Sequence, residues 1–367
     1  MAWGRRSLGL IIAALMAWLL GTPEALSASS IKDDETVLFF PTSAYLDHGA
    51  TAWAVPIHGW IFEPEEDSIW RTAVVEQMLR SLELGREAVG EDLFRQRAAM
   101  FLVDNERGKR LEVRIGGREF TLPASEPNGH FTGTLHIGRD ELEEDPSGAW
   151  VPVESVMGAG DRRRFAGMVR FLPPEGVSVV SDIDDTIKDS NVADKQELLA
   201  NTFMRDFRAV PGMAGQYGRW AAAGAAFHYV SASPWQLFPA LSSFLDEKGF
   251  PRGTVHLKTF RLKDRTFFDL FTSSEAYKIA MIEALLGAYP GRKFLLVGDS
   301  TEKDPEIYGA IARRYPTQVK HIFIRNPSQG DQDRERFRTA FGEIPEGRWT
   351  VFRDPAELGS FGFETDQ

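Results

Sequence analysis

The sequence predicts an α/β fold with a parallel sheet and flanking helices, preceded by a smaller, mainly-β domain of the sandwich-like type. From residue 177 onward, apolar strands alternate with longer helical stretches, which is typical of a parallel sheet. Residues 37–171 instead show short strands separated by frequent turns, as in a sandwich. The chain has 367 residues, 43% of them hydrophobic, which is enough for two or three domains with packed cores.

The N-terminal β domain, residues 37–171, is predicted from its strands and turn signals. Gly116-Gly117 predicts a two-residue hairpin turn between two of the strands. Apolar residues recur at helical spacing between Ile69 and Leu82, so a helix that packs on the core is expected there as an insert. This half shows no pattern of catalytic residues. The main predicted strands are 53–62, 110–115, 131–137 and 165–171.

The second domain is expected over residues 173–326, after the turn sequence Pro173-Pro174-Glu175-Gly176. Residues 327–367 are expected to form an extension packed on this domain, and their sequence shows no clear pattern. In open α/β sheets, ligands bind beyond the carboxyl ends of the strands, so the site is expected there. The predicted strands are 177–182, 225–231, 254–260, 293–299 and 319–324, and the predicted helices are 213–223, 235–248, 272–286 and 305–314.

Composition excludes several classes of function. The chain has no cysteine, so disulfides, thiolate metal sites and cysteine nucleophiles are absent. Its histidines form no H-E-x-x-H pair, so zinc hydrolysis has no support. The net charge of -11 opposes binding to nucleic acid. The remaining chemistry is that of oxygen nucleophiles and ligands.

Residues 1–28 have the pattern of a signal peptide. Arg5 and Arg6 precede an apolar run from Leu8 to Leu20, and small residues follow. That run is shorter than the roughly 20 residues of a spanning helix, which makes an uncleaved anchor the alternative. The pattern predicts an exported, periplasmic protein.

Carboxylates stand at the ends of two predicted strands. Asp182 and Asp184 follow the first strand, where one can act as nucleophile and the other as acid and base. Asp299 ends the fourth strand and Asp304 lies five residues later, so a hard cation could take these oxygens as ligands. The alternative for Asp304, which precedes a proline, is a helix N-cap. Ser231 places a hydroxyl at the end of the second strand.

A transferred phosphoryl group also needs a protein cation. Lys278 is the first candidate, because Thr272 and Glu275 form a capping box that places it in the second turn of a helix leading to the Asp299 strand. Lys258, near the end of the third strand, is the alternative.

These residues occur in the order and spacing of four known motifs. They are D-x-D-x-T (Asp182, Asp184, Thr186), a strand ending in Ser231, the helix lysine Lys278, and G-D-x-x-x-x-D (Asp299, Asp304). The set resembles the haloacid dehalogenase-like (HAD-like) phosphohydrolases. Within that superfamily, residues 182–188, 229–237 and 297–300 resemble the actin-patch-associated phosphatidate phosphatase catalytic domain. Ala232 stands where that family is expected to have Asn, a departure that concerns substrate preference.

The resemblance implies a Rossmannoid sheet and an enzyme, a phosphoric monoester hydrolase that converts phosphatidate to diacylglycerol and phosphate. It implies that Asp182 attacks phosphorus to form an aspartyl phosphate, and that Asp184 protonates the leaving oxygen and then activates water. It implies Mg²⁺ held by the Asp182 side chain, the Asp184 backbone carbonyl and Asp299, with Asp304 as a further candidate. Thr186, Ser231 and Lys278 would hold the phosphoryl oxygens.

Two alternatives remain open at this stage. The first is an exported phosphatase for soluble phosphomonoesters or nucleotides, and the second is a non-catalytic cell-envelope binding module on the same scaffold. Phe267, Phe268 and Phe271, beside Arg261 and Lys263, predict either peripheral membrane contact or core packing. The connection between residues 189 and 208 is expected to be too short for a large lid.

Overall fold

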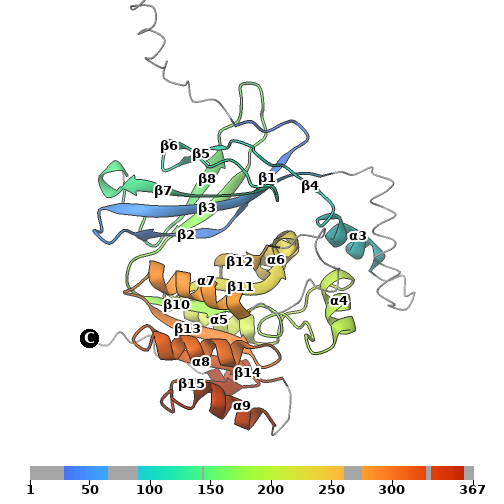
Figure 1. Ribbon diagram of the computed structural model, residues 1–367, viewed down its shortest axis with the longest axis vertical. Helices are drawn as coiled ribbons and strands as arrows, with labels where there is room; N and C mark the ends of the chain where they lie inside the picture. The colour runs from blue at the N-terminus through green and yellow to red at the C-terminus, as the bar shows by residue number, and fades with distance from the viewer. Residues whose placement is uncertain (1–28, 65–89, 143, 260–274, 328–331, 359–367) are drawn as a thin grey trace, which may run out of the picture.

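The computed structural model describes residues 29–64, 90–142, 144–259, 275–327 and 332–358, which form two lobes (Figure 1). The signal segment, the helical insert at 69–82 and the aromatic segment at 265–271 lie outside the described residues, so these three predictions are untested. Within the described ranges, no helix is both long enough and apolar enough to cross a membrane.

The upper lobe in Figure 1 is a nine-stranded, mainly antiparallel sheet. Its order is β1-β3-β2-β9-β8-β5-β6, with β4 and β7 paired to β3. β2 pairs with both β3 and β9, and the core between the two sides of the sheet includes Trp53, Phe131 and Phe171. The prediction of a mainly-β N-terminal region is confirmed. The strands are β1 (Thr36–Phe40), β2 (Thr42–Leu46), β3 (Ala52–Glu63), β4 (Asp104–Asn105), β5 (Glu112–Ile115), β6 (Arg118–Thr121), β7 (His130–Gly138), β8 (Trp150–Ser155) and β9 (Ala166–Phe171), with helix α3 (Glu91–Ala99) and the short η1 (Arg139–Glu141).

The hairpin predicted from two adjacent glycines is present. Gly116 and Gly117 connect β5 to β6 with φ angles of 57° and 76°. Positive φ at both central residues is what a type I′ turn requires, and glycine adopts it without steric cost.

The lower lobe is a six-stranded parallel sheet in the order β12-β11-β10-β13-β14-β15, with helices packed on it (Figure 1). The predicted α/β class is confirmed. Its strands are β10 (Val177–Ser181), β11 (Ala226–Pro234), β12 (Thr254–Lys258), β13 (Lys293–Asp299), β14 (Val319–Arg325) and β15 (Trp349–Phe352). Its helices are α4 (Lys195–Phe203), α5 (Met213–Ala222), α6 (Phe238–Glu247), α7 (Glu275–Ala288), α8 (Asp304–Arg314) and α9 (Gln332–Phe341), with the short η2 (Trp235–Leu237) and η5 (Pro355–Leu358).

Strand β10 fixes where a ligand can bind. The chain runs from β10 outward to β11 and β12, then returns to β13 on the other side of β10. This reversal leaves a crevice at the carboxyl ends of β10 and β13, which is where ligands bind in open α/β sheets.

Two parts of the lower lobe were not predicted as helix or strand. α4 occupies the connection between residues 189 and 208, and Asp194 caps it by accepting hydrogen bonds from the backbone N–H groups of Gln196 and Glu197. In the C-terminal segment, β15 adds a sixth parallel strand beside β14 and α9 packs on α8.

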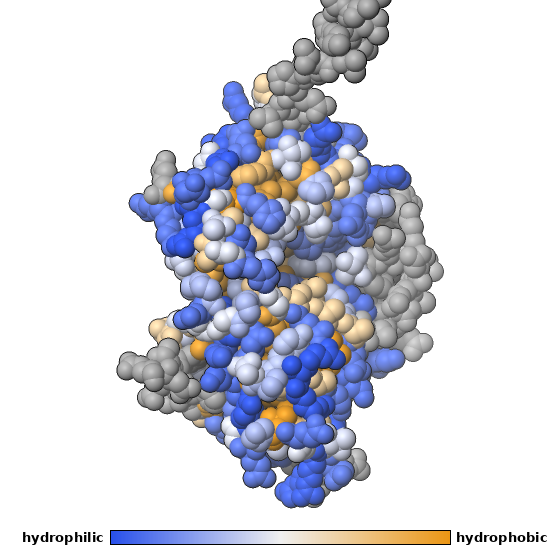
Figure 2. Space-filling model, turned by 60° about the vertical axis from the view of Figure 1, so that its left-hand side comes forward, coloured by the Kyte–Doolittle hydropathy of each residue, from blue (hydrophilic) through white to orange (hydrophobic). Residues whose placement is uncertain are grey.

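The two lobes contact one another directly. Phe40 of the upper lobe stacks on Trp235, with ring centroids 4.0 Å apart, and the hydroxyl of Tyr289 donates a hydrogen bond to Ser43 Oγ at 2.6 Å. Figure 2 shows the waist between the lobes, with hydrophilic and hydrophobic residues intermixed on both.

Candidate active site

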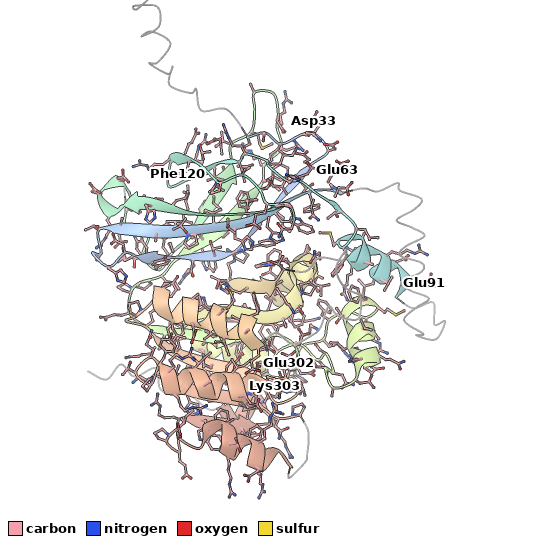
Figure 3. All side chains as sticks on the ribbon, in the orientation of Figure 1. Asp33, Glu63, Glu91, Phe120, Glu302 and Lys303 are labelled. Carbon is pink, nitrogen blue, oxygen red and sulfur yellow. The ribbon has the colours of Figure 1, made fainter. Side chains whose placement is uncertain are left out.

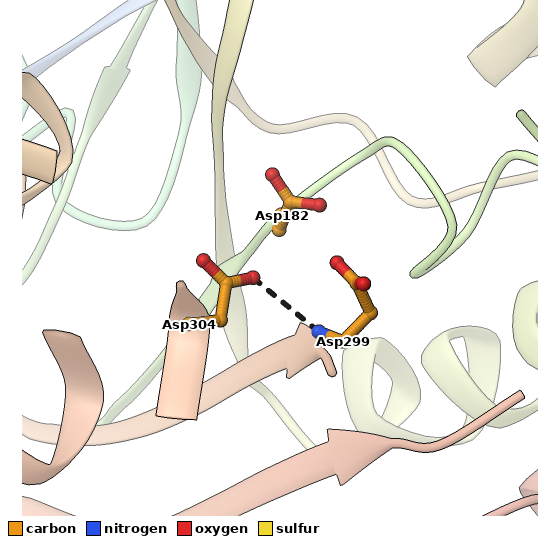
Figure 4. A group of neighbouring side chains, drawn as sticks. All are labelled: Asp182, Asp299 and Asp304. Atoms are coloured by element: carbon orange, nitrogen blue, oxygen red, sulfur yellow. Dashed lines mark hydrogen bonds between the residues drawn. The ribbon is translucent and has the colours of Figure 1, made fainter. Parts of the chain in front are cut away.

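The crevice at the switch point contains three buried carboxylates. Asp182 directly follows β10 and Asp299 ends β13, and the two strands pair in parallel register up to Ser181 and Val297. Asp304 begins α8, and its Oδ2 accepts a hydrogen bond from the backbone N–H of Asp299 at 3.3 Å (Figure 4). One oxygen from each carboxylate lies within 4.8 Å of the others. The structure therefore brings together the carboxylates that the sequence places at separate strand ends.

Lys278 is the cation of this cluster. Its Nζ lies 2.9 Å from Asp182 Oδ1, 2.7 Å from Asp304 Oδ1 and 2.7 Å from Glu302 Oε2. Burial alone would lower the pKa of Lys278, but Asp182, Asp304 and Glu302 raise this pKa well above its usual value. Of the two candidate lysines, the structure places Lys278 against the carboxylates, whereas Lys258 ends β12 at the edge of the sheet.

Asp184 lies in a separate set of contacts. Its Oδ1 lies 2.7 Å from Lys188 Nζ and accepts a hydrogen bond from Ser190 Oγ at 2.7 Å. Its Oδ2 accepts hydrogen bonds from Ser233 Oγ at 2.9 Å and Ser231 Oγ at 3.2 Å. The predicted acid and the predicted phosphate-binding serine are therefore in contact.

The two aspartates of the D-x-D motif have opposite pKa shifts. Burial raises the pKa of Asp182 well above its usual range, and Lys278 only partly offsets the effect. Burial would also raise the pKa of Asp184, but Lys188 and the hydroxyls of Ser190 and Ser233 hold it below its usual range. Two neighbouring carboxyls in different environments are the usual basis for dividing acid and nucleophile roles.

The loop that carries these aspartates is held by Asp185. This residue has a φ of 54°, and its carboxylate accepts hydrogen bonds from the backbone N–H groups of Ser190, Asn191 and Val192. Arg325, at the end of β14, donates to the Asp185 carbonyl at 2.5 Å. The turn after β10 is thereby fixed from two sides.

The structure gives contacts for Thr186 and decides between the two readings of Asp304. Thr186 Oγ1 donates to Asp182 Oδ2 at 3.2 Å, so it contacts the predicted nucleophile, and its predicted contact with phosphate stays a prediction. The N-cap alternative for Asp304 is wrong, because Lys303 holds the cap position of α8 and the helix has no side-chain cap. The oxygens of Asp304 are directed to Lys278 and the Asp299 N–H instead.

Three contact residues were missed by sequence reasoning. Lys188 ends the motif segment 182–188, but the sequence did not indicate that it would contact Asp184. Ser233, two residues after Ser231, also contacts Asp184. Glu302, labelled in Figure 3, lies between the two aspartates of the last motif. Charged residues are normally exposed, so a Lys or Glu buried beside a motif gives no local signal.

The cluster has the donor set of a hard divalent cation. Asp299 Oδ2 is buried and, among the described residues, has no hydrogen-bond partner. Burial and the nearby carboxylates of Asp304 and Glu302 raise the pKa of Asp299 well above its usual range. A divalent ion bound by carboxylate oxygens would give Asp299 Oδ2 a partner and would stabilise the ionised form of Asp299, so these residues fit a cation such as Mg²⁺.

Motif order, switch-point carboxylates and the buried lysine define the HAD-like phosphohydrolase class. Residues 177–326 match the family model described as phosphatidate phosphatase APP1, catalytic domain. This match confirms the resemblance read from the sequence.

The curated relatives are much longer than the matched segment. The chain is 36% identical over 167 residues to phosphatidate phosphatase APP1 of Saccharomyces cerevisiae, which is 44% of this chain and 28% of that protein. It is 28% identical over 168 residues to an uncharacterized protein of Schizosaccharomyces pombe, which is 45% of this chain and 27% of that protein. The chain thus spans less than a third of either relative.

Two solved structures of a Bacillus anthracis class C acid phosphatase align more distantly. The form with tungstate bound has a TM-score of 0.29 and 15% identity, over 49% of this chain and 67% of that one. A second structure of the same enzyme has a TM-score of 0.28 and 16% identity, with the same coverage.

Proposed function

We propose that the protein is a Mg²⁺-dependent phosphatase that hydrolyses phosphatidate to diacylglycerol and phosphate through an aspartyl phosphate. The observation that carries the proposal is the contact of Lys278 with Asp182 in a buried cluster beside Asp299. The family match of residues 177–326 supplies the substrate class.

In the first step, Asp182 attacks phosphorus, so a new O–P bond forms and the ester P–O bond breaks. The departing oxygen takes a proton from Asp184, whose low pKa in the free protein must rise first. A phosphate dianion brought beside Asp184 would raise this pKa, because a like charge favours the protonated form. Lys278 and the hydroxyls of Ser231 and Thr186 would hold the phosphoryl oxygens.

In the second step, water replaces the protein at phosphorus. Asp184 accepts a proton from the water, the water oxygen bonds to phosphorus and the bond to Asp182 breaks, which restores both carboxyl groups. Asp182, Asp299 and the Asp184 backbone carbonyl would hold Mg²⁺, with Asp304 as a further candidate. When bound, the ion supplies positive charge that offsets the repulsion between phosphate and these carboxylates.

The proposal is tested with the Asp182→Asn variant and a matched control, Asp189→Asn. The Asp189 side chain is exposed, and its carboxylate lies 3.9 Å from Arg208 rather than against the buried aspartates. Asp182→Asn should reduce turnover of micellar phosphatidate to background with an unchanged circular dichroism spectrum, whereas Asp189→Asn should keep full activity. Full activity in Asp182→Asn would refute the covalent mechanism.

The substrate is decided by a second comparison. Purified protein with Mg²⁺ is assayed against phosphatidate in mixed micelles, soluble phosphomonoesters and nucleotides. Preference for soluble esters would replace the lipid proposal with the first alternative, and no turnover of any ester would favour the binding module.

We further propose that the protein is exported to the periplasm. The Arg5-Arg6 start and the apolar run from Leu8 to Leu20 support this. Mass spectrometry of the protein from its native host should find a new N-terminus within residues 26–31. An intact Met1 on cytosolic protein would contradict export.

A further inference from the structure

A cavity of about 300 Å³ lies between the lobes, at the edge of the parallel sheet opposite the candidate active site. We name it the junction cavity. Trp150 and Arg170 line it from the upper lobe, and Phe227, His228, Arg252 and Thr254 line it from the lower lobe. It opens at the start of β11, five residues before Ser231, which is about 16 Å along an extended strand. A molecule in it would not contact Asp182.

Two arginines of the cavity lining each lie over the same aromatic ring. The guanidinium carbons of Arg170 and Arg252 lie 5.8 Å and 5.7 Å from the centre of the Trp150 ring. Within the described part of the chain, neither guanidinium has an ion pair or hydrogen bond, although the chain as a whole is acidic. The arginine forks are therefore available to a ligand in the cavity.

The described lining of the junction cavity includes no carboxylate, and the nearest described one in a shared pocket is Asp246, which lines a neighbouring cavity together with Arg252. Burial and, to a smaller extent, the positive charge of Arg170 lower the pKa of Arg292, and the hydrogen bonds of Arg292 go to the carbonyls of Pro173, Glu175 and Val177 and to Ser178 Oγ. Burial lowers the pKa of Arg170. An unpaired, partly buried guanidinium is costly, and an oxyanion in the cavity would offset that cost.

We propose that the junction cavity binds a small phosphorylated molecule, held by Arg170 and Arg252 with Trp150 and Phe227 as its apolar walls. A carboxylate is satisfied by one guanidinium fork, whereas two forks from different lobes match the charge and the oxygens of a phosphate dianion. The volume is at the lower end of small-molecule pockets. The inference does not depend on the proposed phosphatase activity.

The test uses purified full-length protein in EDTA, so that the acidic active site repels anions. Inorganic phosphate, phenylphosphonate and benzoate are titrated by calorimetry; phenylphosphonate resists hydrolysis, and benzoate is its carboxylate counterpart. Phenylphosphonate should bind about tenfold more tightly than benzoate, a difference of about 1.4 kcal/mol. If phenylphosphonate binds more tightly than inorganic phosphate, the ligand is an organic phosphate. If the two bind equally tightly, the ligand is free phosphate.

Single variants locate the site. Arg170→Gln and Arg252→Gln should each weaken phenylphosphonate binding by about tenfold or more. Arg110→Gln removes the same charge from an exposed position in the upper lobe and should bind as the wild type does. Should Arg170→Gln fold poorly, Arg170→Lys keeps the charge without the fork and should still weaken binding. No binding by the wild type at millimolar phosphonate, or equal binding by all variants, would overturn the proposal and leave the arginines as contacts between the lobes.

Discussion

Replacement of Lys278 by methionine tests whether this lysine compensates the buried carboxylates. The Nζ lies 2.7–2.9 Å from oxygens of Asp182, Glu302 and Asp304. At an effective dielectric constant of 20, one such pair attracts by about 6 kcal/mol before desolvation is counted. Removal of one member of a buried pair costs about 3–5 kcal/mol, because the remaining charges lose compensation. We expect Lys278→Met to lower the free energy of unfolding by that amount at pH 8 in EDTA.

The same variant should recover stability in acid. The pKa of Asp182 is raised by burial even with the lysine present, and loss of Lys278 removes the cation that partly offsets this rise. A carboxyl with a raised pKa in the folded state favours folding below its unfolded pKa, and this contribution is lost as the pH rises through the folded pKa. The loss in the free energy of unfolding caused by Lys278→Met should therefore be smaller at pH 5 than at pH 8.

The measurement is urea unfolding followed by tryptophan fluorescence at both pH values. Lys248→Met, on the exposed end of α6, should stay within about 0.5 kcal/mol of the wild type. A loss below about 1 kcal/mol at pH 8, or an equal loss at both pH values, would show that the charge of Lys278 does not stabilise the cluster.

Three further predictions concern the same cluster. In Gly298→Ala, the new Cβ would lie 2.3 Å from Asp304 Oδ2. Phosphatase activity should therefore be lost, and the free energy of unfolding should fall by about 1–3 kcal/mol. The control Gly287→Ala, whose Cβ would have no atom within 4 Å, should keep its activity and be as stable as the wild type or more stable. Asp299→Asn should raise stability in EDTA at pH 8 by about 1 kcal/mol, because it removes a buried charge whose pKa is raised, while activity is lost; a less stable variant would contradict the raised pKa. Arg336 donates to the carbonyls of Ser300 and Glu302, so Arg336→Ala should lower kcat more than it changes KM, and an unchanged kcat would show that the loop holds its geometry without it.

The central strands and their terminal aspartates were predictable because the information is local. Residues 177–181 and 293–298 are apolar runs that end directly in Asp182 and Asp299, and both runs lie in the middle of the sheet. Parallel pairing then brings the two strand ends together whatever the connecting segments do. The sheet and the meeting of these two carboxylates therefore followed from sequence.

The partners of Asp184 were not predictable in the same way. Lys188 is almost fully buried, yet nothing in the local pattern distinguishes it from a surface lysine. It is buried because the left-handed turn at Asp185 folds the loop back, and that turn depends on contacts with residues 190–192 and Arg325. Helix α4 was missed for a related reason: its first turn is polar, and its buried face packs on helix α3 of the upper lobe, which is distant in sequence.

The contacts also separate the two halves of the proposed chemistry. Asp184 has its own buried cation, Lys188, at 2.7 Å, whereas Lys278 is shared among Asp182, Glu302 and Asp304 with Asp299 nearby. The first environment is close to neutral, and the second carries excess negative charge, which agrees with the opposite pKa shifts of Asp184 and Asp182. A divalent cation at Asp182 and Asp299 would relieve the second environment and leave the first largely unchanged. Under the proposed mechanism, the nucleophile therefore depends on the metal for its ionisation, while the acid is set by protein contacts and by the arriving phosphate.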